Sequence, residues 1–479
     1  MNPVEQAILD VPTGLALLAG LSVIWILLGR YWGRSADSVD DFMLAGRKVG
    51  LALGTATAMA TWVTSNTTMV APQLALQMGV WGMVGYSLGA VGLLLFAPMA
   101  RRIRSLMPHG YTSGDFFRLR YGKAAWRIFL LISVFYSFCW LISLGMAGGI
   151  LIHALSGIPY QVGLTVILAI CVTYTLLGGL RAVIGTDFIQ VLVILIGIVI
   201  LGYQVIQATG FEEMHQTLSK ENPMLLDLLF PAAIMFLFNN LLFGMGEIFH
   251  SNVWWSRAFA YKEGVGFKAY LLAGLFWAPV PIAAGFVALS APVIGLNVPV
   301  ADMVGPLVAA ELLGKGGAVM VFIVVFCALA SSLDSLLAAT SDLLVQDIYC
   351  KHLNPQASPA QLRRAAQVAI LSLGVGAWLV CLPRVTTLAS LLHFTGAFVA
   401  ATIWPILAGL YWRRAHPGAA CAAMVLGSLA GLTAYFVIGF YVAALMAAVV
   451  SMVVVLLGAW LSKARFDWAN LNENKGETP

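Results

Sequence analysis

Residues 60–68 read ATWVTSNTT, a polar run inside an otherwise apolar segment at 49–73. A helix that faces lipid tolerates few such side chains, because polar groups in the bilayer core need partners. One interpretation is an intact helix in which the hydroxyls bond to carbonyls one turn earlier. The other is a helix broken at this point, where freed backbone groups line a binding site at mid-membrane.

A second anomaly lies at 239–252, which reads NNLLFGMGEIFHSN. Two glycines, Gly244 and Gly246, stand beside the carboxylate of Glu247, and amides flank all three. Such a segment makes a poor continuous membrane helix, so we expect a second break near these glycines. The two anomalous segments are five spans apart, where two inverted five-helix repeats would place corresponding helices.

The composition agrees with a chain that lies largely in a membrane. Of the 479 residues, 61% are hydrophobic and 10% are charged, and the mean hydropathy is +0.91. Soluble domains average about 25% charged residues. A water-soluble globule, a disordered chain, a nucleic-acid module and a secreted disulfide scaffold are therefore excluded. Six cysteines stand singly, with no spacing typical of a metal site.

Runs of about 20 apolar residues predict about thirteen membrane helices, a lead helix followed by helices 1 to 12. The fold class is therefore an all-α integral membrane protein. The predicted spans lie near 12–30, 49–73, 79–100, 126–155, 160–178, 183–207, 226–255, 266–292, 316–345, 365–383, 386–411, 417–438 and 440–462.

Basic residues set the expected orientation, because cytoplasmic loops carry an excess of Lys and Arg. The loop after the lead helix, the loop after helix 2 and the loops after later even-numbered helices are basic. Arg257, Lys262 and Lys268, for example, follow helix 6. This alternation predicts an outside N-terminus and a cytoplasmic C-terminus. It also explains the net charge of +5 without a nucleic-acid partner.

Helix 8 contains the run CALASSLDS at 327–335. The spacing i, i+3, i+4, i+7 puts four small or hydroxyl residues on one helical face. Close helix packing would explain such a face. The alternative is an oxygen site for a hard cation. These residues are Ala328, Ser331, Ser332 and Ser335.

Two carboxylates, Asp187 in helix 5 and Asp334 in helix 8, are expected at a comparable depth in the membrane. An ionisable group at mid-membrane costs roughly 2.5–3.5 kcal/mol on insertion scales, so each needs a reason to be there. A bound cation or a shared proton would supply one.

Several motifs in chain order resemble the sodium/solute symporter family. DFMLAGR at 41–47 is similar to the entry of its first helix, and YTLLGGLRAV at 174–183, with Thr186, Asp187 and Gln190, resembles its helix 4–5 junction. The serine run of helix 8, and GLYW at 409–412 with Gly418, also fit. The segment from 61 to 79 and residues 254–258 loosely resemble the urea and polyamine branch.

The resemblance implies a LeuT-like fold in one transmembrane domain over 1–479. Helices 1 and 6 would be broken around a central site. The implied parts are a lead helix with an entry loop at 1–48, a first repeat at 49–207, a second repeat at 226–411 and two extra helices at 417–462.

It also implies coupling-ion sites. Sodium would be bound by the carbonyls of Ala60, Val63 and Ala328 and by the hydroxyls of Ser331 and Ser332. Some family members place a second ion between a helix 5 aspartate and two serines of helix 8. Asp187 and Ser335 match that pattern, but Asp334 replaces a serine, which makes a proton or a carboxylate-dominated cation site an equal alternative.

Glu247 falls where sugar-transporting members carry an aromatic gate residue. A carboxylate there favours a solute with N–H donors or positive charge. The candidate substrate-binding residues are Trp62, Gln73, Glu247, Asn252 and His393. For His393, packing in the protein core is an alternative. Trp254 and Trp255 either flank this pocket or form an interfacial belt.

We therefore expect a sodium-coupled symporter that imports a small nitrogenous solute such as an amine, an amide, urea or a guanidine. A proton-coupled symporter for a neutral or carboxylate solute and a passive channel are the alternatives. The metalloprotease motif HExxH does not occur. The expected partners are the solute and membrane lipid, without an obligate protein partner, and the expected location is a bacterial inner membrane.

Overall fold

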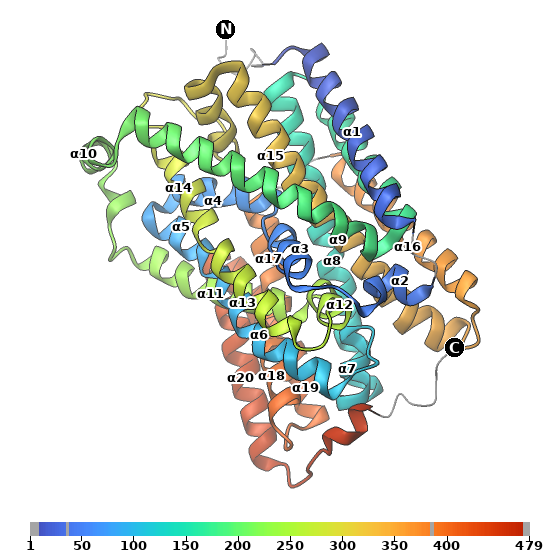
Figure 1. The fold of residues 1–479 in the computed structure, drawn as a ribbon. Coiled ribbons are helices and arrows are strands. Elements are labelled where there is room, and N and C mark those ends of the chain that lie inside the picture. The colour runs from blue at the N-terminus through green and yellow to red at the C-terminus, as the bar shows by residue number, and fades with distance from the viewer. Residues whose placement is uncertain (1–8, 35–37, 384–387, 473–479) are drawn as a thin grey trace.

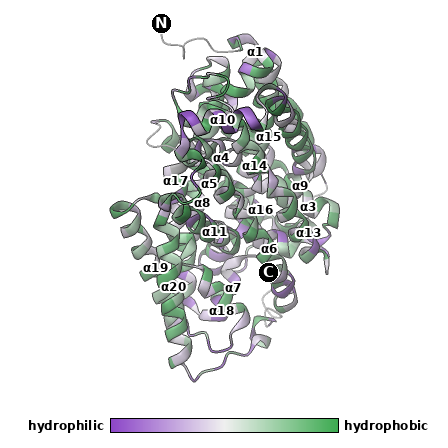
Figure 2. Ribbon diagram, turned by 90° about the vertical axis from the view of Figure 1, so that its left-hand side faces the viewer, coloured by the Kyte–Doolittle hydropathy of each residue, from purple (hydrophilic) through white to green (hydrophobic). Residues whose placement is uncertain are grey.

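The computed structural model describes residues 9–34, 38–383 and 388–472, and its regular elements are helices (Figure 1). Within these residues, eleven helical stretches are long and apolar enough to cross a membrane. Figure 2 shows hydrophobic residues along most of the long helices. The protein is therefore an all-helical integral membrane protein.

The described residues hold eleven such helices where about thirteen spans are predicted, because one long helix covers two predicted spans and the span at 49–73 is divided into two shorter helices. α1 (Val11–Gly33) corresponds to the lead helix and packs along α9 (Tyr160–Thr209). Further helices are α5 (Val80–Ser87), α6 (Gly89–Leu106), α7 (Ser113–Tyr121), α8 (Lys123–Ser156), α10 (Phe211–Glu221), α13 (Val265–Trp277), α14 (Pro279–Leu289), α15 (Val304–Leu344), α16 (Pro359–Cys381), α17 (Leu388–Ala400), α18 (Ile403–Tyr411), α19 (Pro417–Val437) and α20 (Ala443–Leu461).

α9 covers two predicted spans, 160–178 and 183–207, because it turns sharply at Gly179. Gly179 has φ +53°, and a Cβ there would lie 2.5 Å from the carbonyl oxygen of Phe42. Only glycine fits this backbone conformation and this close approach. The glycine pair of the motif at 174–183 thus kinks the chain between two spans.

The polar run at 60–68 divides the predicted span 49–73 into α3 (Leu51–Trp62) and α4 (Ser65–Met78). Thr64 caps α4, because its hydroxyl accepts from the Thr67 amide at 3.0 Å while the Thr67 hydroxyl accepts from the Thr64 amide at 3.2 Å. The freed carbonyl of Trp62 accepts from Thr67 and from the Trp277 indole. The run therefore satisfies the backbone groups that the interruption leaves unpaired.

The second anomalous segment is interrupted further along than the sequence suggests. α11 (Pro231–His250) continues through Gly244 and Gly246, and the chain becomes extended only at Ser251, before α12 (Asn252–Ala260). The expectation of a break at the glycines is wrong. They allow close packing instead: a Cβ on Gly244 would lie 2.6 Å from the Cα of Gly89.

α15 lies at the centre of the helix bundle and packs against α9, α8 and α4 (Figure 1). Its residues from Val324 to Leu343 are all buried. The polar side chains in this segment therefore face protein and not lipid.

Candidate ion site and substrate cavity

Two serines of α15 bond to the end of α3, next to the helix interruption. The Ser331 hydroxyl donates to the Ala60 carbonyl at 2.9 Å, and the Ser332 hydroxyl donates to the Thr61 carbonyl at 3.1 Å. Both hydroxyls also lie within 3.1 Å of the Ala328 carbonyl. The structure thus brings four of the five predicted sodium-binding residues together, with Thr61 in addition.

The fifth predicted residue, Val63, lies in the non-helical link between α3 and α4 and is fully buried. The oxygens gathered here are uncharged carbonyls and hydroxyls, which are ligands that hard cations accept. The arrangement therefore has the chemistry of a monovalent cation site between α3 and α15.

One turn further along α15, a buried arginine occupies the region assigned to a second ion. Arg257 of α12 donates to the Asp187 carboxylate at 3.3 Å and to the Ser335 hydroxyl at 2.6 Å. It also donates to Thr57 and Thr61 of α3. The guanidinium thereby connects α12 with α3, α9 and α15.

This position corrects the sequence analysis, which counted Arg257 as a loop charge. Its side chain and that of Asp187 are both 0% exposed. A buried charge persists when it is paired and its hydrogen bonds are satisfied. Arg257 supplies both the charge and the donors, so the carboxylate of Asp187 already has a cation beside it.

Asp334 faces a different neighbour from Ser335. One of its carboxylate oxygens accepts from the Tyr174 hydroxyl at 2.9 Å, and that hydroxyl also lies 3.1 Å from the Ala330 carbonyl. The side chain is fully buried. Asp187 and Asp334 thus have separate partners, a guanidinium and a phenol.

A cavity of about 260 Å³ lies at the interruption between α3 and α4. The Trp62 ring forms one wall and contacts the rings of Trp140, Trp254 and Trp277 at centroid distances of 5.6–6.2 Å. The described residues that line the cavity are mainly aromatic, with three polar residues from 64–67: Trp62, Thr64, Asn66, Thr67, Tyr86, Tyr136, Trp140, Phe243, Trp277 and Leu392.

Two hydrogen-bond donors of this lining have no partner among the described residues. They are the Trp62 indole N–H and the Asn66 amide. Buried polar groups are usually bonded, and a group left unpaired costs about 1–3 kcal/mol. The cavity therefore offers donors to a ligand that carries acceptor oxygens.

Glu247 does not line this cavity. Both of its oxygens accept from the Trp254 indole at 3.2 Å, and the Trp254 ring stands between it and Trp62. Trp254 and Trp255 are both fully buried, so neither belongs to an interfacial belt. Glu247 lies one side chain away from the cavity wall.

The remaining candidates lie elsewhere. Gln73 is buried in α4 but is not a lining residue. Asn252 bridges two elements, because its oxygen accepts from the Ser113 amide and its nitrogen donates to the Ala339 carbonyl. His393 lies 3.3 Å from the Asn240 side chain, among phenylalanine rings. Of the five predicted substrate residues, only Trp62 reaches the cavity.

The sequence alone did not point to three residues that contact the buried charges: Thr57 and Thr61 beside Arg257, and Tyr174 beside Asp334. Thr57 and Thr61 are spaced i, i+4 on α3 and meet Arg257, a pattern that the sequence does display. Tyr174 lies inside a motif, but its role depends on contact with α15. Arg257 carries no sequence signal that separates it from a loop residue.

Comparison with known proteins agrees with the geometry. The family model described as Sodium:solute symporter family matches residues 42–427. The urea-proton symporter DUR3 of Oryza sativa is 27% identical over 456 residues, 87% of this chain and 63% of that protein. The urea active transporter of Saccharomyces cerevisiae is 24% identical over 390 residues, 75% of this chain and 53% of that protein. The chain thus spans less than two thirds of either relative.

A solved structure shows the same fold. The substrate-bound outward-open state of a Na+-coupled sialic acid symporter superimposes with a TM-score of 0.80 and 18% identity, covering 95% of this chain and 98% of that one. The matched family and these relatives are transporters rather than enzymes.

Proposed function

Because this chain belongs to the sodium:solute symporter family, we propose that it is a sodium-coupled secondary active symporter for a small carbonyl-bearing nitrogenous solute of the amide or urea class. The observation that carries the proposal is the contact of Ser331 and Ser332 with the Ala60 and Thr61 carbonyls. This contact joins an interrupted helix to the buried helix α15.

Sodium would be held by the carbonyls of Ala60, Val63 and Ala328 and by the two serine hydroxyls. Bound there, it would fix α3 against α15 and favour one conformation of the carrier. A ligand shifts a conformational equilibrium only when it binds the two states unequally. A site shared between an interrupted helix and its neighbour meets this requirement, because the site is dismantled when the two helices separate.

The solute would bind in the cavity beside Trp62. A carbonyl oxygen can accept from the unpaired donors of Trp62 and Asn66. A planar amide can also stack on the aromatic walls. An amine or guanidinium lacks the acceptor oxygen, so the cavity supports amides and ureas over the other nitrogenous solutes.

For the whole chain we propose thirteen spans with an outside N-terminus and a cytoplasmic C-terminus, in a bacterial inner membrane. The repeats would be 49–207 and 226–411, followed by the extra helices at 417–462. Support comes from the interruptions at Val63 and Ser251, which occur in the first helix of each repeat.

Arg257 bears on the second-ion hypothesis for Asp187, Asp334 and Ser335. Its guanidinium already bonds to Asp187 and Ser335. We therefore propose one sodium per solute, with the Arg257 guanidinium in the place of a second ion.

The test is uptake of radiolabelled urea and acetamide into proteoliposomes. An inward sodium gradient should drive accumulation above the external concentration. Accumulation driven only by a proton gradient would identify a proton as the coupling ion, and equilibration without accumulation would identify a channel. Either result would overturn the proposal.

A variant tests the cavity separately. Trp62→Phe keeps an aromatic six-membered ring but removes the five-membered ring with its N–H, whose bond to the solute is worth about 0.5–1.5 kcal/mol. The concentration for half-maximal uptake should therefore rise about 2- to 10-fold. Trp378→Phe is the matched control, since its N–H bonds to Thr165 in an exposed position.

A further inference from the structure

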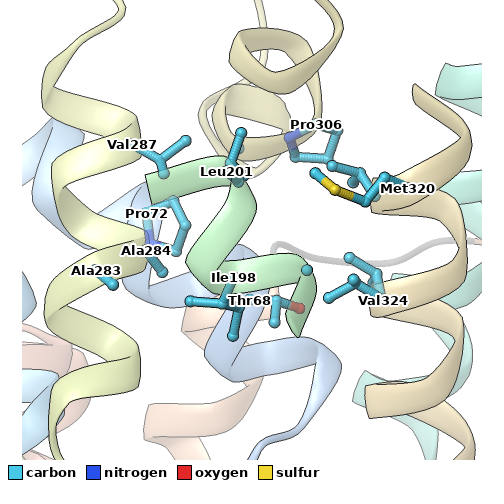
Figure 3. Close-up of a pocket in the computed structure, with 14 residues that line it drawn as sticks. Thr68, Pro72, Ile198, Leu201, Ala283, Ala284, Val287, Pro306, Met320 and Val324 are labelled. Atoms are coloured by element: carbon cyan, nitrogen blue, oxygen red, sulfur yellow. The ribbon is translucent and has the colours of Figure 1, made fainter. Parts of the chain in front are cut away.

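Two adjoining apolar cavities form a groove on the side of the helix bundle, away from the cavity at Trp62. The first, of about 510 Å³, lies between α4, α9, α14 and α15 (Figure 3). The second, of about 600 Å³, lies between α9, α14 and the start of α10. They share Ala283 and Val287 of α14. We call the two together the lateral groove.

The lining of the lateral groove excludes a polar ligand. Among the described residues that line it, Thr68 alone has a polar side chain, and its hydroxyl bonds to the Ser65 carbonyl at 3.1 Å. Figure 3 shows Ile198, Leu201 and Val324 among the side chains that line the first cavity.

The groove is continuous with the surface that faces lipid. Its own lining residues Ile206 and Phe211 are 43% and 54% exposed. Beside it on α9, Val199 and Tyr203 are 69% and 61% exposed. In an integral membrane protein, these apolar side chains contact acyl chains, so an acyl chain can enter the groove without crossing water.

We propose that the lateral groove binds one acyl chain of a membrane phospholipid. The chain would lie along α9 and α14 and would contact Thr68 and Pro72 on α4. Because α4 follows the helix interruption at Val63, the lipid would support the position of that half-helix. This inference does not depend on the identity of the solute or of the coupling ion.

The groove can be filled without disturbing the backbone. A Cβ added to Gly202, which lines the second cavity, meets nothing within 4 Å. Gly202→Phe therefore places a ring in the groove. Gly20→Phe is the matched control, because Gly20 also has open space around it and lies on α1, outside the groove. Ala283→Phe is a second filling variant, at a residue that lines both cavities.

The experiment uses the purified full-length protein in a mild detergent. Intact-protein mass spectrometry would count phospholipid retained after delipidation, and thermal unfolding would be followed while dioleoyl phosphatidylglycerol is added back. The wild type and Gly20→Phe should retain one phospholipid and gain Tm as the lipid saturates the groove. Gly202→Phe and Ala283→Phe should lose the retained lipid and most of the Tm gain.

Three results would overturn the proposal: a wild type without retained phospholipid, a wild type that retains only detergent, or filling variants that keep the lipid and the Tm gain. Sodium-dependent uptake, measured in parallel, separates this outcome from a failure of the proposed function. If the protein takes up solute in a sodium-dependent way but retains no phospholipid, the proposed lipid site is contradicted and the proposed transport function is not.

Discussion

The Arg257 guanidinium donates to the Asp187 carboxylate at 3.3 Å, and neither side chain is exposed. The two residues are 70 positions apart in the chain and lie on α12 and α9. Their contact joins the second interrupted helix to the bundle, one turn from the serines that we assign to sodium.

Removal of one partner of this pair should destabilise the protein strongly. Arg257→Gln leaves Asp187 buried without a counter-charge, which costs about 3–5 kcal/mol. Thermal unfolding of the purified variant measures the loss. Lys268→Gln, a control at an exposed basic residue of α13, should change stability by less than about 0.5 kcal/mol.

The double variant Asp187→Asn/Arg257→Gln shows whether the two residues act as a pair. It should be less destabilised than the sum of the single variants, because it leaves no unpaired charge. Strict additivity would contradict the pairing.

Thr64→Ala should weaken the cap of α4. The variant loses the hydroxyl that accepts from the Thr67 amide, and the loss of an N-cap costs about 1 kcal/mol. Thr64→Ser should keep the stability of the wild type. Thr173→Ala removes an exposed hydroxyl that bonds to a carbonyl four residues earlier, and it should be close to neutral. Thermal unfolding of all three variants compares them, and equal loss in Thr64→Ala and Thr173→Ala would argue against the cap.

Gly244→Ala should be destabilising although alanine favours helices. The new Cβ would meet the backbone of Gly89 at 2.6 Å, and overpacking of this kind costs about 1–3 kcal/mol. Gly20→Ala, with nothing near its Cβ, should be neutral or stabilising. Unfolding midpoints in detergent distinguish the two, and a stable Gly244→Ala would refute the packing role of this glycine.

Much of the fold could be predicted from the sequence, because hydropathy reports directly which segments suit a bilayer. The polar run at 60–68 also marked an interruption, since its threonines cap the helix that follows. Gly244 and Gly246 were misread because glycine either ends a helix or lets another helix approach. Only the position of Gly89 shows which applies.

The candidate site residues, too, could be predicted from the sequence only in part. Ser331 and Ser332 were found because helical spacing puts them on one face, and the structure brings that face to Ala60. Arg257 was assigned to a loop because a basic residue near the end of a span usually marks the cytoplasmic side. Its partner Asp187 becomes apparent only after folding. Asn252 looked like a pocket residue, but its amide bridges α7 and α15.

We propose that Ser331 and Ser332 bind the sodium ion that drives uptake, and the decisive measurement is the sodium dependence of uptake in Ser331→Ala and Ser332→Ala. Each substitution removes one oxygen ligand, so the sodium concentration for half-maximal uptake should rise about tenfold or more, a change of about 1.4 kcal/mol. Ser341→Ala, at a buried hydroxyl of α15 that bonds within its own helix, should leave this concentration unchanged. An unchanged sodium dependence in both site variants would show that these serines do not bind the coupling ion.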